Sequence, residues 1–246
     1  MHMRHPKVYL SPSKQPHNIY ATGNTNEEKE MVEVSRLLKR ILEEEYGIET
    51  VLSDLSLDIG RNGRPKEAKD KGCSIYLAIH SNAGGSGKAK GAVALFHPAS
   101  KDSKALGRIL VEELNGICPY GSNRSEPLVD GMRAFQGKGF GEIRTPYEYG
   151  MTPVLMETNF HDHMDIAKWM TGNKEAIARS YGRALAKFLQ VGKKTSHDPI
   201  KDPVSKAADE SGLYRVQVGA FRKIENAEEL KARLWSFGFE GFISFR

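Results

Sequence analysis

Short apolar runs alternate with longer amphipathic stretches between residues 7 and 189. The amphipathic stretches repeat apolar residues every three or four positions, which predicts helices, most clearly over 31–42, 103–117 and 174–189. The short runs are rich in β-branched and aromatic residues, which predicts buried strands. The alternation predicts an α/β fold with a mixed, mostly parallel sheet flanked by helices. The strands of this sheet are expected at 7–10, 49–52, 74–79, 91–96 and 153–157.

The pattern changes in the last quarter of the chain. Residues 192–212 contain proline, serine and charged residues with almost nothing to bury, which predicts a linker. Strand patterns over 214–219 and 238–245, with a helical stretch between them, predict a small C-terminal βαβ module. A segment this short buries little core, so we interpret 213–246 as half of a larger module. The main domain is expected at 1–191.

Composition and charge narrow the class of protein. Of the 246 residues, 39% are hydrophobic and 27% are charged, which is ordinary for a globular protein. The net charge of +5 favours an anionic partner such as a cell wall rich in carboxylates and phosphates. Nucleic acid is not expected, because the basic residues form no stripe with interleaved aromatics. No run approaches the roughly 18 apolar residues of a membrane helix, and the N-terminal residues lack the apolar segment of a secretory signal. We therefore expect no membrane insertion and synthesis in the cytoplasm.

Four polar residues stand where they could meet at one edge of the predicted sheet. His80 ends the strand at 74–79, and in open α/β sheets this edge is where ligands bind. His17 lies in the loop after the first strand, and Glu28 lies in the first turn of the following helix. Two imidazoles and a carboxylate, with one open position for water, are the ligand set of a catalytic zinc site. Glu157 ends the last strand and is a candidate general base beside that water. Helix geometry alone does not decide whether Glu28 or its neighbour Glu27 is the ligand.

Four separated stretches, in the same order, resemble the zinc-dependent N-acetylmuramoyl-L-alanine amidases of the amidase-3 type. These enzymes are cell-wall hydrolases found among autolysins and phage endolysins. The matching stretches are VYLSPSKQPHN, NEEKEMVEVSRLL, IYLAIHSNAGG and PVLMETNFHDH.

The resemblance implies a role for each of the four residues. It implies that His17, Glu28 and His80 hold Zn²⁺ and that Glu157 is the catalytic glutamate. Glu28 is preferred to Glu27 because EKEMVEVSRLL keeps the family's spacing from glutamate to the apolar stripe. The chain departs from the family in one place, because many members carry G-H-G-G where this chain has Ser-Pro-Ser at 11–13.

The tail, LYRVQVGAFRKIENAEELKARLWSFGFEGFISF, resembles one half of the SPOR module, which binds glycan strands of the bacterial wall. Together the two resemblances imply zinc-dependent hydrolysis of the amide between N-acetylmuramic acid and L-alanine in peptidoglycan. The expected partner is peptidoglycan, and the expected state is a monomer that reaches the wall after release, as a phage endolysin or a sporulation lysin. The alternatives are a zinc peptidase acting within the stem peptide and a non-catalytic wall-binding protein.

Overall fold

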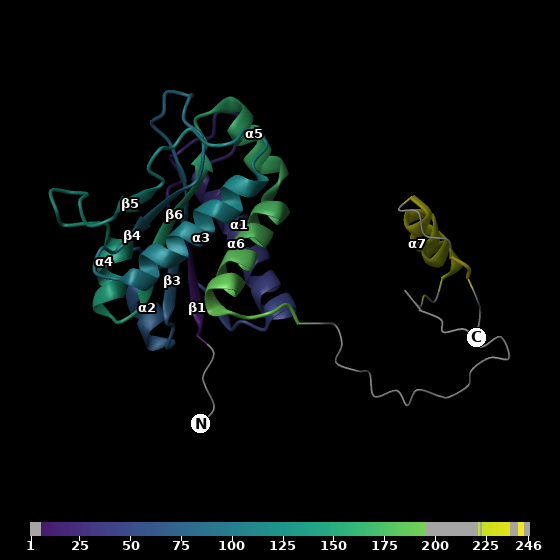
Figure 1. Cartoon of the computed structure of the whole chain (residues 1–246), viewed down its shortest axis with the longest axis horizontal. Coiled ribbons are helices and arrows are strands. Elements are labelled where there is room, and N and C mark those ends of the chain that lie inside the picture. The colour runs from purple at the N-terminus through teal and green to yellow at the C-terminus, as the bar shows by residue number, and fades with distance from the viewer. Residues whose placement is uncertain (1–5, 195–220, 222, 237–240, 244–246) are drawn as a thin grey trace. The chain divides into compact units, whose positions relative to one another are not determined.

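The computed structural model describes residues 6–194, 221, 223–236 and 241–243. The chain divides into two compact units, Met1–Ser196 and His197–Arg246 (Figure 1). In the second unit the described helix is α7 (Ile224–Ser236), which begins two residues before the helical stretch expected at 226–237 and overlaps most of it. The strand predicted at 214–219 lies outside the described residues, as does most of the strand predicted at 238–245.

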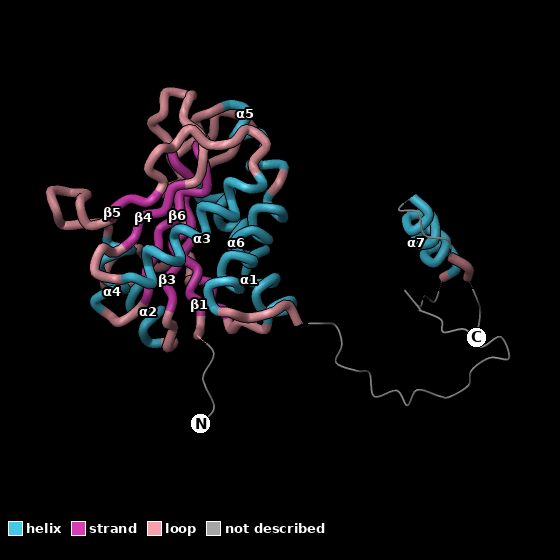
Figure 2. The backbone as a smooth tube through the Cα atoms, viewed as in Figure 1, coloured by secondary structure: helices cyan, strands magenta, loops and turns pink. Residues whose placement is uncertain are grey.

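The first unit is built on one six-stranded sheet with the order β2-β1-β3-β6-β4-β5 (Figure 2). Neighbouring strands are parallel except β4 and β6, which are antiparallel. This arrangement confirms the predicted α/β fold with a mixed, mostly parallel sheet. The strands are β1 (Val8–Pro12), β2 (Thr50–Leu52), β3 (Ile75–Asn82), β4 (Val93–Phe96), β5 (Leu128–Asp130) and β6 (Thr152–Phe160).

Helices cover both faces of this sheet (Figure 1). α1, α3 and α6 pack against one another over one face, while α2 and α4 lie together over the other. Among the helices of the described residues, none combines the length and apolar character needed to cross a membrane. The helices are α1 (Glu27–Ile41), the π-helical turn η1 (Leu42–Tyr46), α2 (Arg64–Asp70), α3 (Lys101–Ile117), α4 (Gly141–Glu148), α5 (Met164–Gly172) and α6 (Lys174–Leu189).

Alternation along β3 assigns its side chains to two different cores. Leu77 and Ile79 belong to the larger core under α1, α3 and α6. Tyr76 and Ala78 belong to the smaller core on the α2 and α4 side. Because successive side chains of a strand point to opposite faces, His80 falls on the same face as Tyr76 and Ala78. His80, two residues before the end of β3, therefore faces α4.

The start of α1 is fixed by its N-cap. The Asn26 side-chain oxygen accepts a hydrogen bond from the Lys29 backbone N–H at 3.0 Å, which satisfies one of the free donors of the first turn. Acidic residues follow in that turn, where the helix dipole favours negative charge. The buried stripe of α1 then faces the core. Its members are Met31, Val34, Leu38 and Ile41.

The segment at 119–144, which the sequence predicts as irregular, contains β5 and the beginning of α4. β5 is three residues long and is not fully buried, so it has no apolar alternation to recognise. α4 begins without a side-chain cap and carries Pro146 within it, so the usual signals of a helix are missing. Tertiary contacts with β6 and α2 hold this helix instead.

The buried stripe of α1 yields a prediction on stability. Leu38 is fully buried, whereas its neighbour Leu37 is partly exposed at the edge of the same core. Leu38→Ala should lower the free energy of unfolding by about 2–5 kcal/mol, because it removes buried methyl groups and leaves a cavity. Leu37→Ala is the matched control, with an expected loss of about 1 kcal/mol. Urea unfolding followed by circular dichroism measures both losses; equal losses would contradict this packing of α1.

Candidate active site

The centre of the site is the imidazole of His80, near the carboxyl end of β3. The side chain is buried and lies between two carboxylates. Its Nδ1 is 3.0 Å from Oε1 of Glu27, and its Nε2 is 3.1 Å from Oε2 of Glu142. Both carboxylates are buried as well, Glu27 at 1% and Glu142 at 3% exposure. Three segments that are far apart in the sequence therefore meet at the rim where the sequence predicts a site.

Glu27 reaches this rim because it is the first residue of α1. Its Oε1 also accepts a hydrogen bond from the Ser81 backbone N–H at 3.3 Å. Its Oε2 accepts one from the Asn18 side-chain amide at 2.6 Å. The same Asn18 amide donates to the side-chain oxygen of Gln15 at 2.8 Å, and Gln15 Nε2 lies 3.2 Å from His80 Nδ1. The loop after β1 and the start of α1 thus join in one network around His80.

The structure places the carboxylate of Glu27 against His80, whereas the resemblance points to its neighbour Glu28. Helix geometry alone allows either residue. Asn26 is the N-cap, so Glu27 occupies the first helical position and turns toward the sheet. Glu28 is about 100° further around the helix and is half-buried. His17 is exposed, and in the described part of the chain no hydrogen bond or ion pair joins it to His80. Its role as a ligand stays a prediction.

Glu157 stands beside His80 on the neighbouring strand. The two residues are register partners in the parallel pair of β3 and β6, so their side chains share a face of the sheet. The Glu157 side chain is partly covered, and its Oε2 is fully buried without a hydrogen-bond partner. Burial raises the pKa of Glu157 to about 7, while the nearby charge of His80 opposes this rise. A carboxylate with an unpartnered oxygen and a raised pKa is suited to exchange a proton with a bound molecule.

Glu142 is the residue of this site that sequence reasoning missed. It lies at the start of α4, in the segment predicted as irregular. Its Oε1 accepts hydrogen bonds from Ser11 Oγ at 2.6 Å and from Tyr76 OH at 2.9 Å. Ser11 in turn accepts one from the buried Arg64 guanidinium. The only signal in the sequence is a carboxylate just before the apolar Ile143, which does not indicate a partner 62 residues away.

The protonation states of His80, Glu27 and Glu142 depend on one another. Burial alone would lower the pKa of His80, but hydrogen bonding to Glu142 and Glu27 raises it to about 10. Burial would raise the pKa of Glu27, and its hydrogen bond with His80 and the charge of His80 lower it instead. The pKa of Glu142 is lowered in the same way against the effect of burial. A positive charge between these carboxylates is thus what holds both in their ionised form.

The zinc ion that the resemblance implies can be tested against these side chains. Imidazole nitrogen and carboxylate oxygen are ligand atoms that zinc prefers, and His80 Nδ1 and Glu27 Oε1 are in contact. No cluster of three or more His, Cys, Asp and Glu side chains suited to a metal occurs among the described residues. Two of the described side chains, His80 and Glu27, thus offer adjacent ligand atoms of the kind that zinc prefers.

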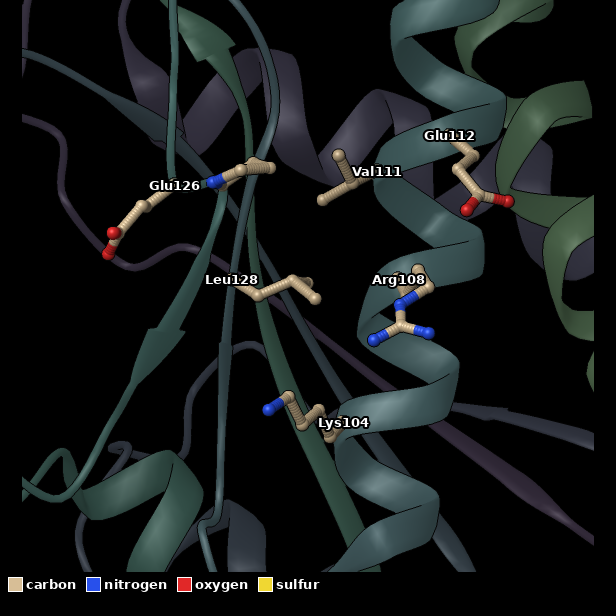
Figure 3. A pocket seen from close by; sticks show the side chains of 7 residues that line it. Lys104, Arg108, Val111, Glu112, Glu126 and Leu128 are labelled. Carbon is tan, nitrogen blue, oxygen red and sulfur yellow. The ribbon is translucent and has the colours of Figure 1, made fainter.

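A separate surface hollow of about 430 Å³ lies between α3 and the segment around β5 (Figure 3). Lys104 and Arg108 line it from α3, and Glu126 and Leu128 line it from the other side. Charges of both signs face this hollow, and it shares no residue with the group around His80. The chemistry at the rim of the sheet is therefore independent of it.

Comparison with proteins of known sequence finds two similar amidases. The sporulation-specific N-acetylmuramoyl-L-alanine amidase of Bacillus subtilis (strain 168) is 26% identical over 243 residues, covering 96% of this chain and 84% of that protein. The N-acetylmuramoyl-L-alanine amidase CwlM of Bacillus licheniformis is 24% identical over 246 residues, covering 98% and 85% respectively. The chain thus aligns with most of the length of both relatives.

Solved structures share the fold of the first unit. The catalytic domain of CwlV, an N-acetylmuramoyl-L-alanine amidase from Bacillus (Paenibacillus) polymyxa var. colistinus, superposes with a TM-score of 0.60 at 18% identity. This alignment covers 76% of this chain and 99% of that domain. The CwlD amidase from Clostridioides difficile, solved in complex with the GerS lipoprotein, gives a TM-score of 0.61 at 19% identity, covering 75% and 98%.

Two family models match the chain. The SPOR domain matches residues 210–245, the region where the sequence predicts half of such a module. The N-acetylmuramoyl-L-alanine amidase model, Amidase_3, matches residues 9–187, which is more than half of the chain and includes every residue of the group around His80. The chain therefore belongs to the Amidase_3 family of N-acetylmuramoyl-L-alanine amidases.

Proposed function

We propose that this amidase hydrolyses the amide between the lactyl group of N-acetylmuramic acid and L-alanine with Zn²⁺ as its cofactor, through His80, Glu27 and Glu157. The family match supports the reaction. The observation that carries the residue assignment is the meeting of β3, β6 and the start of α1 at one rim, with an imidazole and two carboxylates side by side.

His80 and Glu27 would hold the zinc ion through Nδ1 and a carboxylate oxygen. When bound, zinc would supply a Lewis acid and would make water a stronger acid. Two residues of the loop after β1 compete for a third position. His17 is the residue predicted from the resemblance. Gln15 lies nearer, but the atom that it turns to His80 Nδ1 is the amide Nε2, at 3.2 Å, whereas its Oε1, the atom that could bind a metal, accepts a hydrogen bond from Asn18. We therefore keep His17 as the proposed third ligand.

Glu157 would act as general base and then as general acid. Its unpartnered Oε2 takes a proton from the attacking water, whose oxygen forms a bond to the scissile carbonyl carbon. The C–N bond then breaks, and the same proton passes to the leaving nitrogen of L-alanine. An amide nitrogen leaves poorly unless it is protonated, so one carboxylate that both accepts and returns a proton serves both halves of the reaction.

The rest of the chain would bind the peptidoglycan polymer and so hold the catalytic unit near its substrate. We propose that residues 1–191 form the catalytic unit, that residues 192–212 link it to the tail, and that residues 213–246 bind glycan strands. The SPOR match and the net charge of +5 support a peptidoglycan partner. We further propose that the enzyme is a monomer and meets its substrate after release to the cell wall.

The products of wall digestion test this function. Purified peptidoglycan treated with the full chain should release peptides with L-alanine at the N-terminus and leave the glycan strands intact. Excess chelator should abolish the release, and added zinc should restore it. Mass spectrometry of the soluble fraction measures both results. Cleavage within the stem peptide would favour the alternative peptidase, and binding to the wall without soluble products would favour a non-catalytic binder.

Replacing the general base should separate chemistry from metal binding. Glu157→Gln keeps the size of the side chain but removes its ability to accept a proton, so peptide release should fall by about 10²–10⁴-fold. Its zinc content, measured by atomic emission, should equal that of the unaltered protein. Glu148→Gln, a carboxylate removed from the surface of α4, is the matched control. Normal release by Glu157→Gln would remove Glu157 from the mechanism.

Two adjacent glutamates offer a matched test of the metal site. Glu27→Gln removes the carboxylate that contacts His80, so affinity for zinc should fall by at least about tenfold. Glu28→Gln alters a half-buried carboxylate of the same turn and should leave affinity unchanged. Competition with a chromophoric chelator measures both values. The opposite ranking would restore Glu28, and unchanged zinc affinity of His17→Ala in the same titration would remove His17 from the metal site.

A further inference from the structure

We propose that Glu142 is a positioning residue of this centre, which holds His80 by Nε2 and so presents Nδ1 to Glu27 and to the metal. The inference rests on the proposed function and adds to it a residue outside the four predicted from the sequence. It stands on three contacts of one buried side chain. Glu142 Oε1 is engaged by Ser11 and Tyr76, and Glu142 Oε2 lies 3.1 Å from His80 Nε2.

The two oxygens of Glu142 have different partners. Hydroxyl donors from β1 and β3 fix Oε1, so the carboxylate cannot swing away from the sheet. Oε2 is left to face His80, which is its only hydrogen-bond partner in the described part of the chain. A carboxylate at 3% exposure is costly unless it is hydrogen-bonded, and here both of its oxygens have partners. The donors from the sheet thus aim the carboxylate at one atom of the imidazole.

Hydrogen bonding to Glu142 decides which nitrogen of His80 is free. An imidazole that binds a metal is neutral and carries one proton, and an ionised carboxylate can only accept a hydrogen bond. Glu142 therefore selects the tautomer with the proton on Nε2, and the lone pair of Nδ1 then points to the side of Glu27 and Gln15. Carboxylates that accept the second N–H of a metal-binding histidine orient the ring and raise its affinity for the metal. Glu142 stands in this relation to His80.

A matched set of variants tests the inference. Glu142→Gln places an amide against Nε2 and disfavours the required tautomer, so zinc affinity should fall by about 10–100-fold. Glu148→Gln, which alters a surface carboxylate of the same helix, is the matched control and should leave zinc affinity within about threefold of the unaltered value. Tyr76→Phe and Ser11→Ala each remove one of the two hydrogen bonds that fix Oε1 and should lower the affinity less than Glu142→Gln does. Chelator competition measures affinity, and urea unfolding of the metal-free proteins measures stability. If Glu142→Gln lowers stability and leaves zinc affinity unchanged, Glu142 is only structural.

A measurement on the unaltered chain covers the case in which Glu142→Gln does not fold. In the zinc-loaded protein, ¹⁵N–¹H correlation of the imidazoles should show His80 with its proton on Nε2 and the metal on Nδ1. His80→Gln identifies the signals of this ring. Zinc on Nε2 would overturn the role of Glu142 even if the wall amide is cleaved. Zinc on Nδ1 in a protein that cleaves no wall amide would instead overturn the proposed function and leave this inference standing.

Discussion

The whole site depends on one imidazole held between two buried carboxylates. His80 is flanked by Glu27 from the start of α1 and by Glu142 from the start of α4. Two buried carboxylates close to each other are unfavourable unless each finds hydrogen-bond donors and a positive partner. Each has its own donors here, Asn18 and the Ser81 backbone for Glu27, and hydroxyl groups for Glu142. Helices α1 and α4, which cover opposite faces of the sheet, thereby both contact His80 near the end of β3.

The register of the sheet positions the remaining residue of the site, Glu157. β3 and β6 are parallel neighbours, and their register places Glu157 beside His80. A shift of this register by one residue would turn the glutamate to the opposite face of the sheet, where α1, α3 and α6 pack. The apolar residues of β6 prevent such a shift, because Met156 and Leu155 belong to different cores. The packing that stabilises the sheet is therefore what places Glu157 beside His80.

The sequence predicts the site residues on strands better than those at the start of helices. His80 and Glu157 each follow an apolar run, and the change from apolar to polar residues marks both, although the strands continue to Asn82 and Phe160. The choice between Glu27 and Glu28 depends on whether Thr25 or Asn26 caps the helix, and a shift of one residue rotates the side chain by about 100°. Glu142 has no local pattern, because tertiary contacts place its short helix.

The loop between β1 and α1 is the part of the site where this chain departs from the family pattern. Its Asn18 donates to both Gln15 and Glu27, so the loop is joined to the helix by one side-chain amide. His80, Glu142 and Glu157 all stand on strands or on a helix, whose packing leaves them little freedom. Loop residues can change without repacking a core, so the loop is the part of this site where a substitution is tolerated most easily. The positions of His80, Glu142 and Glu157 relative to one another are set instead by the packed strands and helix.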